Sequence, residues 1–145
     1  MLSVRQILKN KGDKVWTTRP DATVYEALQL MAEKNVGALL VMEGETLRGI
    51  FSERDYARKI ILHGKSSKEA PVSEIMTPEV ITVSPDESIV TCMNLMTEKR
   101  IRHLPVVEAN RVIGVISIGD VVKAIISEQQ FTINQLENYI SGKRS

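Results

Sequence analysis

Apolar and polar positions along the chain follow one pattern twice. Short β-prone runs at residues 15–18 and 80–83 are each followed by a proline turn and by apolar residues spaced three or four apart, as on one face of a helix. Two further extended runs come next in each copy, separated by the turn-like segments EGET and EANR. A second helical stretch closes each copy, at about 53–63 and 118–131. The pattern predicts the order β-α-β-β-α in each half.

The two halves are copies of one unit. A shift of 65 positions carries the phrase GIFSERD onto GVISIGD and needs no gap over residues 15–61. The short helical segment at 4–8 matches 72–76 only by a shift of 68, so the first copy carries about three extra residues near 10–13. Two copies, rather than many, favour an α/β (α+β) fold in which the units pack by their sheets about a pseudo-twofold axis.

Together the copies are expected to form one compact module, because neither half alone has enough apolar surface for a secure core. We place the first unit at residues 1–67, the second at 68–131 and a helical tail at 132–145. The tail puts Ile133 and Leu136 on one helical face. That face packs either on the body of the module or on a second subunit.

Composition narrows the function. The formal net charge of the 145 residues is +1 and aromatic residues make up 4%, which argues against nucleic acid as a partner. The lone cysteine, Cys92, falls on an apolar helical stripe and is expected in the core. The apolar runs are too short to cross a bilayer and no secretion signal is evident, so we expect no membrane partner and a cytoplasmic location.

The repeated phrase carries the candidate chemistry. Ser52 and Ser117 each stand at an expected helix start, three residues before Asp55 and Asp120 respectively. A serine hydroxyl at a helix N-terminus can donate to a phosphate, and an ionised aspartate accepts hydrogen bonds, which suits the two hydroxyls of a ribose. The same Ser-x-x-Asp spacing is also an ordinary helix cap, and that alternative stays open.

Catalytic and metal-binding motifs do not match. The segment GVISIG has the wrong glycine spacing for a nucleophile elbow. The segment GKSS lacks the upstream glycine of a phosphate loop and follows a helix rather than a strand. Two scattered histidines and one cysteine give no metal-ligand spacing. We therefore expect neither an enzyme nor a metal requirement.

The β-α-β-β-α unit with GIFSERD and RIRHLPVV…GVISIGD resembles the CBS domain, named after cystathionine β-synthase. Two such domains in tandem form a CBS pair, or Bateman module. The resemblance implies adenosine-ligand binding in the clefts between the copies, with AMP, ADP, ATP, NAD or S-adenosylmethionine as the usual ligands. It also implies a homodimer, in which two pairs form a flat disc of four units, and an unknown regulated protein as partner.

The resemblance assigns the second site more completely than the first. A basic pair at the middle strand, Arg102 and His103, is implied to contact phosphate, and Lys11 or Lys14 adds positive charge. Because this pair is expected near the pseudo-axis, it can alternatively serve either site. Arg102 is alternatively a solvated charge, and His103 a strand residue packed between the copies. The predicted second-site residues are Lys14, Val15, Trp16, Gly37, Ala38, Arg102, His103, Ser117, Ile118, Gly119 and Asp120.

The first site consists of Ser52, Glu53, Arg54 and Asp55. Arg54 can reach a phosphate, but Glu53 repels one, so occupancy of this site is in doubt. Alternatively, Arg54 belongs with Arg58 and Lys59 to a solvated helix face. The sequence thus predicts a regulatory module that binds an adenine nucleotide, AMP, ADP, ATP or NAD(H), and modulates a partner. The competing hypothesis is a constitutive dimeric scaffold with vestigial ligand sites.

Overall fold

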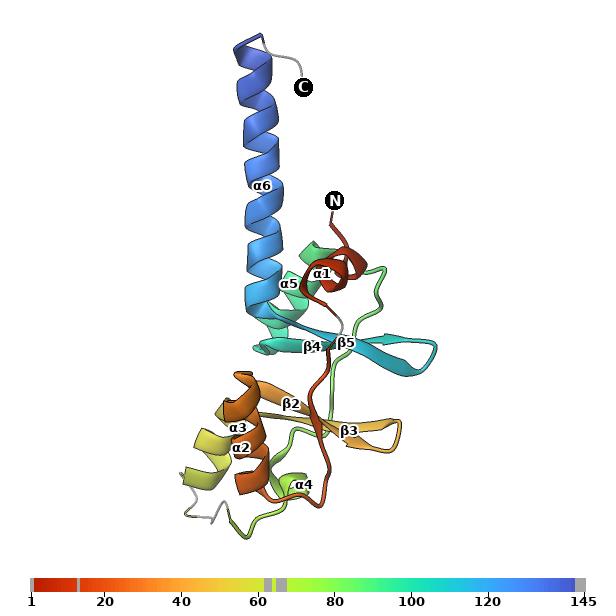
Figure 1. Ribbon diagram of the computed structural model, residues 1–145, viewed down its shortest axis with the longest axis vertical. Coiled ribbons are helices and arrows are strands. Elements are labelled where there is room, and N and C mark those ends of the chain that lie inside the picture. Colours follow the sequence, from red (N-terminus) through yellow and green to blue (C-terminus); the bar gives the residue numbers. More distant parts are fainter. Residues whose placement is uncertain (1, 13, 62–63, 65–67, 143–145) are drawn as a thin grey trace.

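The computed structural model describes residues 2–12, 14–61, 64 and 68–142. Two similar α/β units lie next to each other along the long axis of the molecule, and one long helix projects from the second unit (Figure 1). The expected end of the first unit's closing helix at residues 62–63, and the last three residues of the tail, lie outside the described residues.

The first unit contains a three-stranded sheet in the order β1-β2-β3, with β1 parallel to β2 and β2 antiparallel to β3. Its elements are β1 (Thr17–Thr18), α2 (Val24–Lys34), β2 (Ala38–Glu43), β3 (Thr46–Ser52), α3 (Glu53–Asp55) and the π-helix η1 (Tyr56–Ile61). Thr23 caps the N-terminus of α2 and forms a reciprocal capping box with Glu26. The single closing helix expected from the sequence is thus one α-helical turn followed by a π-helical segment.

The second unit repeats this arrangement 65 residues later. Its elements are α5 (Ile89–Lys99), the antiparallel pair β4 (His103–Glu108) and β5 (Arg111–Ser117), and α6 (Ile118–Ile140). Even the register irregularity recurs, between Val41 and Met42 in β2 and between Val106 and Val107 in β4. The internal repeat read from the sequence is therefore confirmed as a structural repeat.

The strand expected at residues 80–83 is reduced to one isolated bridge at Val83. In the first unit, the amide of Leu40 donates to the carbonyl oxygen of Trp16 at 3.2 Å and so extends the pairing of β1 with β2. Pro105 takes the place of Leu40 in the second unit, and proline has no N–H to donate. The missing donor shortens the second ladder.

The two hydrophobic cores are built from interleaved segments. α1 (Val4–Lys11) packs into the core of the second unit, and α4 (Val72–Ile75) packs into the core of the first. Each unit therefore needs a short helix that lies in the chain just before the other unit. Cys92 is fully buried in the second core, as expected, and burial together with the charge of Glu87 raises the pKa of its thiol to about 11.

The glycine of each repeated phrase lets a short helix approach the sheet. A Cβ atom at Gly49 would lie 2.8 Å from the carbonyl oxygen of Thr77, just after α4. A Cβ atom at Gly114 would lie 2.6 Å from Cδ2 of Leu8 in α1. Both glycines are thus explained by close packing inside the module.

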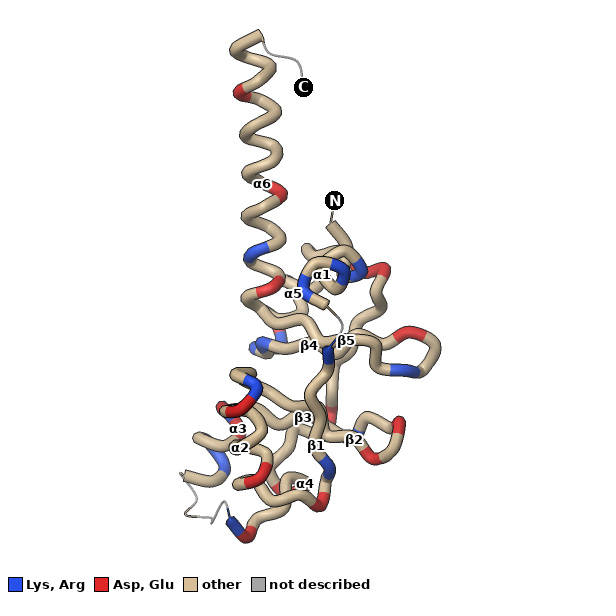
Figure 2. The backbone as a smooth tube through the Cα atoms, viewed as in Figure 1, with Lys and Arg blue, Asp and Glu red and all other residues tan. Residues whose placement is uncertain are grey.

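The expected closing helix and the expected tail form one continuous helix, α6, of 23 residues. Its first turns pack on the second unit, and its C-terminal half extends away from both units (Figure 1). That half carries few charged residues (Figure 2). Within the described chain, the apolar face at Ile133 and Leu136 does not pack on the body, since these residues are 47% and 57% exposed.

Candidate functional site

Two clefts open between the units, one beside each Ser-x-x-Asp helix start. The first cleft, beside Ser52, has a volume of about 330 Å³, and the second, beside Ser117, has a volume of about 360 Å³. Gly37 and His103 line both clefts, so the two adjoin near the centre of the module. Each cleft is large enough for part of a small organic ligand.

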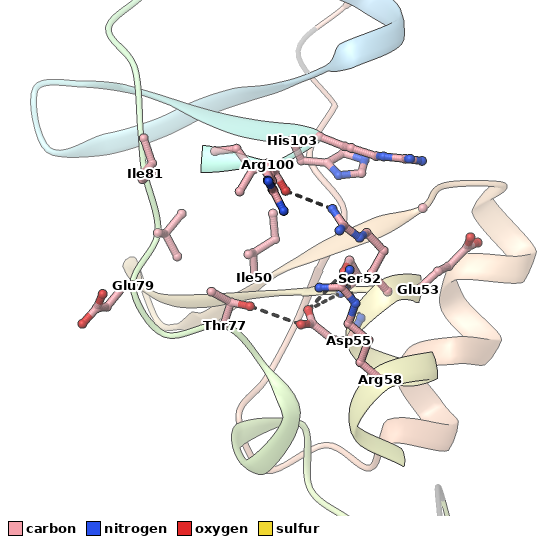
Figure 3. Close-up of a pocket in the computed structure, with 15 residues that line it drawn as sticks. Ile50, Ser52, Glu53, Asp55, Arg58, Thr77, Glu79, Ile81, Arg100 and His103 are labelled. Atoms are coloured by element: carbon pink, nitrogen blue, oxygen red, sulfur yellow. Dashed lines mark hydrogen bonds between the residues drawn. The ribbon is translucent and has the colours of Figure 1, made fainter. Parts of the chain in front are cut away.

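All four residues predicted for the first site line the first cleft: Ser52, Glu53, Arg54 and Asp55. Figure 3 shows these side chains with residues from the linker after α4 and from the second unit. Arg102, which the sequence assigns to the second site, lines this first cleft and not the second. The structure thus gathers basic side chains from both units beside Ser52.

The predicted residues that line the second cleft are Lys14, Trp16, Gly37, Ala38, His103 and Ser117. Asp120 borders it through hydrogen bonds with Ser117 and Lys11. Val15, Ile118 and Gly119 are not among the residues recorded as lining either cleft. The structure therefore brings most of the predicted second site together, whereas Val15, Ile118, Gly119 and Arg102 do not line this cleft.

Each Ser-x-x-Asp phrase forms a reciprocal capping box. The Ser117 amide donates to Oδ2 of Asp120 at 2.8 Å, and the Asp120 amide donates to Oγ of Ser117 at 3.2 Å. The first unit repeats these contacts at 3.0 and 3.3 Å between Ser52 and Asp55. The capping role left open by the sequence is thus present in both copies, and it orients each aspartate at the mouth of a cleft.

The two aspartates differ in their other partners. Asp55 also accepts a hydrogen bond from the Ser52 hydroxyl and one from the Thr77 hydroxyl, at 3.1 and 3.2 Å, and its side chain is only 12% exposed. Asp120 pairs with the Lys11 ammonium, and its side chain is 23% exposed. Asp55 is therefore the more enclosed and the more fully bonded carboxylate.

Electrostatics in the second cleft favour an ionised aspartate beside a neutral histidine. Burial alone would raise the pKa of Asp120, but hydrogen bonds from Lys11 and Ser117 lower it below its ordinary value. Burial lowers the pKa of His103, and the positive charges of Lys11 and Arg102 lower it further. At neutral pH this cleft thus presents a carboxylate, an ammonium and an uncharged imidazole.

The first cleft contains residues that the sequence did not assign to it. Arg58, Thr77, Glu79 and Arg100 line it together with the predicted residues. Arg58 and Arg100 add to Arg54 and Arg102, so the basic groups here outnumber those expected. Arg100 corresponds to Asn35 by the shift of 65, and Asn35 lines the second cleft. Both residues form left-handed helix C-caps with φ near 55°.

Among the residues with a described placement, no group of three or more His, Cys, Asp or Glu side chains is arranged to hold a metal ion. No described helix has the length and hydropathy needed to span a membrane.

Comparison with protein families identifies the class. The family model for the CBS domain matches residues 4–62 and again residues 72–127. The chain belongs to this family and carries two CBS domains in tandem, as the resemblance in the sequence indicated. The matched stretches cover the paired units and the two clefts between them.

Relatives with the same organisation are known. The chain is 44% identical over 150 residues to the mitochondrial CBS domain-containing protein CBSX3 of Arabidopsis thaliana, with 97% of this chain and 72% of that protein covered. A putative signal-transduction protein with CBS domains from Burkholderia ambifaria has a similar structure, with a TM-score of 0.86, 52% identity, and 91% and 99% of the two chains covered.

A second similar structure was solved with ligands. The CBS domain pair of protein MJ0100 forms a complex with 5′-methylthioadenosine and S-adenosyl-L-methionine. Its TM-score against this chain is 0.77 at 25% identity, with 88% of this chain and 98% of that one covered.

Proposed function

We propose that this protein is a regulatory module that binds an adenine nucleotide in the second cleft and changes its contacts with a partner protein. The observation that carries the proposal is the arrangement of Asp120, Lys11 and Ser117 at the mouth of a cavity between two CBS domains. A related CBS pair binds two adenosine-containing ligands, which supports the ligand class.

The chemistry of the second cleft suits a nucleotide. Asp120 is ionised and can accept hydrogen bonds from ribose hydroxyls. Gly37 and Ala38 leave room beside the sugar and base, while Trp16 offers an aromatic wall. Lys11 and Lys14 supply positive charge for phosphate. AMP, ADP and ATP fit this set of groups, and NAD(H) shares the same adenosine phosphate.

The second cleft is the stronger candidate because its aspartate is more accessible to a ligand. A ligand at Asp55 must displace hydrogen bonds from both Ser52 and Thr77 at a carboxylate that is 12% exposed. A ligand at Asp120 displaces an ammonium at a carboxylate that is 23% exposed. The basic side chains of the first cleft suit an anionic ligand, which would bind there after the second cleft is occupied.

Regulation follows if the ligand binds two arrangements of the units with different affinity. The two clefts lie between the units, so a ligand contacts both and favours one relative placement. We therefore propose a non-catalytic role toward a separate protein, which the sequence leaves unidentified. The cytoplasmic location stays a prediction, and one relative carries a mitochondrial name.

We also propose that the chain forms a homodimer, for which the exposed face of α6 offers a contact. Apolar residues follow a heptad spacing along this face, with 40% to 82% of each side chain exposed: Val122, Ile126, Ile133, Leu136 and Ile140. Isoleucine occupies one core position throughout and leucine occupies the other at residue 136, and this combination favours two-stranded pairing of identical helices. Gln129 is the one polar residue in the sequence of this seam, and such residues help to fix register.

A constitutive dimeric scaffold is the second candidate. Both Ser-Asp pairs already satisfy each other as helix caps, and this alone accounts for the repeated phrase. The two candidates differ in their response to ligand. A sensor is stabilised by an adenine nucleotide at constant subunit count, whereas a scaffold is not.

The test is a calorimetric titration of the full chain with AMP, ADP, ATP and NAD, together with thermal unfolding in the presence of each. We expect saturable binding in the micromolar range by at least one of them, with a raised melting temperature. Absence of both heat and thermal shift for all four would reject the sensor and leave the scaffold.

A further inference from the structure

The second cleft holds its aspartate with a cation. Lys11, the last residue of α1, donates from Nζ to Oδ2 of Asp120 at 2.6 Å and to the carbonyl oxygen of Val115 at 2.8 Å. The Lys11 side chain is 35% exposed. The ion pair therefore lies at the rim of the cleft, where an incoming ligand can reach it.

In the first cleft a neutral residue makes the corresponding two contacts, and the ammonium of Lys59 lies farther from the carboxylate, with Nζ 3.6 Å from Oδ1 of Asp55. The Thr77 hydroxyl donates to Oδ1 of Asp55 at 3.2 Å, and the Thr77 amide donates to the carbonyl oxygen of Ile50 at 2.9 Å. Ile50 and Asp55 stand where Val115 and Asp120 stand one repeat later. Both carboxylates thus have an ammonium partner, but the contact of Lys11 with Asp120 is the shorter one, at 2.6 Å against 3.6 Å for Lys59 with Asp55. Only Lys11 also bridges the carboxylate to the preceding strand, a link that Thr77 makes in the first unit.

This difference arises where the sequence repeat breaks. α1 has eight residues, whereas its counterpart α4 has four. The additional turn carries Lys11 to the cleft, and the contact of Leu8 with Gly114 fixes this end of α1 against β5. The extra residues of the first copy therefore equip the second cleft with a charge that the first cleft does not obtain from α4.

We propose that Lys11 is a specificity-determining residue that makes the second cleft select phosphorylated adenosine ligands over uncharged nucleosides. The inference rests on the proposed function. A ribose that donates its hydroxyls to Asp120 competes with the ammonium for Oδ2. An uncharged nucleoside takes the carboxylate from the ammonium and gives it no anion in return, whereas a phosphate gives it a new charge-assisted hydrogen bond.

The neighbouring groups leave this role to Lys11. His103 lines the same cleft, but partial burial and the charges of Lys11 and Arg102 lower its pKa, so its imidazole is largely uncharged at neutral pH. Lys14 also lines the cleft, but the lysine that pairs with Asp120 is Lys11. Lys11 is thus the cation that exchanges the protein carboxylate for a ligand phosphate.

The test compares adenosine with AMP by calorimetry on the full chain carrying Lys11→Met. We expect the ratio of the adenosine Kd to the AMP Kd to fall by roughly tenfold, because a charge-assisted hydrogen bond to phosphate is lost. The Kd for adenosine itself should decrease, since Asp120 is released. Lys11→Arg keeps the charge and should keep the preference for AMP.

Lys9→Met is the matched control, because it removes the same charge from the same helix at an exposed residue that does not line the cleft. An unchanged ratio in Lys11→Met, or an equal change for both ligands, would overturn the inference while leaving the proposed function standing. A wild-type chain that binds neither adenosine nor any of AMP, ADP, ATP and NAD would instead reject the proposed function. Thermal unfolding confirms that each variant is folded, and Lys11→Gln replaces Lys11→Met if the latter is not.

Discussion

The guanidinium of Arg54 donates a hydrogen bond to the carbonyl oxygen of Arg100 at 2.9 Å, across the boundary between the two units. Arg54 lies just after β3 of the first unit, and Arg100 caps α5 of the second unit in the left-handed conformation, with φ 54°. This contact answers one question left open by the sequence. Arg54 is a bridging residue at the first cleft rather than a member of a purely solvated face.

Removing this bridge should weaken the module modestly. We expect Arg54→Ala to lower the free energy of unfolding by about 1 kcal/mol, as for a hydrogen bond from a charged group near the surface. Chemical denaturation of the variant measures this directly. Arg48→Ala, at an exposed residue that pairs with Glu43 inside the first unit, is the control and should change stability less. Equal losses would show that Arg54 does not join the units.

The glycines of the repeated phrase should tolerate alanine unequally. Gly49→Ala drives its Cβ against the carbonyl oxygen of Thr77, whereas Gly114→Ala drives it against the end of the Leu8 side chain. A backbone group yields less readily than a side-chain methyl group. We expect both variants to lose about 1–3 kcal/mol of stability, with the larger loss for Gly49→Ala. Chemical denaturation measures the free energy of unfolding of both variants. A larger loss for Gly114→Ala than for Gly49→Ala would contradict this packing argument.

His103 should make stability depend on pH. Its pKa in the folded chain lies below the ordinary value of 6.5, because burial and the charges of Lys11 and Arg102 outweigh the opposing charge of Asp120. The unfolded state therefore binds more protons as the pH falls below about 6.5, and stability should be lost through that range. The melting temperature of the wild type should fall between pH 7.5 and pH 5.5 by more than that of His103→Gln. Parallel falls in the two proteins would show that His103 is not the titrating group.

The exposed seam of α6 should control the subunit count. Leu136→Asp places a charge in the seam without touching either core, since Leu136 is 57% exposed. We expect this variant to sediment as a monomer over concentrations at which the wild type is a dimer. Gln135→Asp adds the same charge next to the seam and should remain dimeric. If the two variants sediment alike, α6 is not the dimer contact.

Much of the fold could be predicted because the chain repeats itself. The shift of 65 correctly aligned α2 with α5, β2 with β4 and β3 with β5. It failed at residues 80–83, where the missing N–H of Pro105 shortens the ladder. The interleaving of α1 and α4 was also not predicted, because apolar spacing shows which face of a helix is buried but not which core buries it.

The candidate site was predicted through its local phrases and missed where distant segments meet. The pairs Ser117–Asp120 and Ser52–Asp55 could be predicted from spacing, because the two members of each pair lie in the first turn of the same helix. Thr77 and Arg58 enter the first cleft only through the packing of the linker and of η1. The sequence assigned Arg102 to the second site with either site as an alternative, and the structure places it at the first cleft. Arg102 precedes β4, which begins at His103, and only His103 lines both clefts.

The most direct measurement of the central claim is the affinity of AMP for the wild type, Asp120→Asn and Asp55→Asn, determined by calorimetry under identical conditions. If the ribose is held by Asp120, Asp120→Asn should weaken AMP binding by roughly tenfold or more, and Asp55→Asn should have a much smaller effect. In both variants the asparagine side-chain oxygen can still accept the hydrogen bond from the serine amide, so both capping boxes are kept and the two variants differ only in which cleft loses its carboxylate. Equal affinity in the wild type and Asp120→Asn would contradict the account.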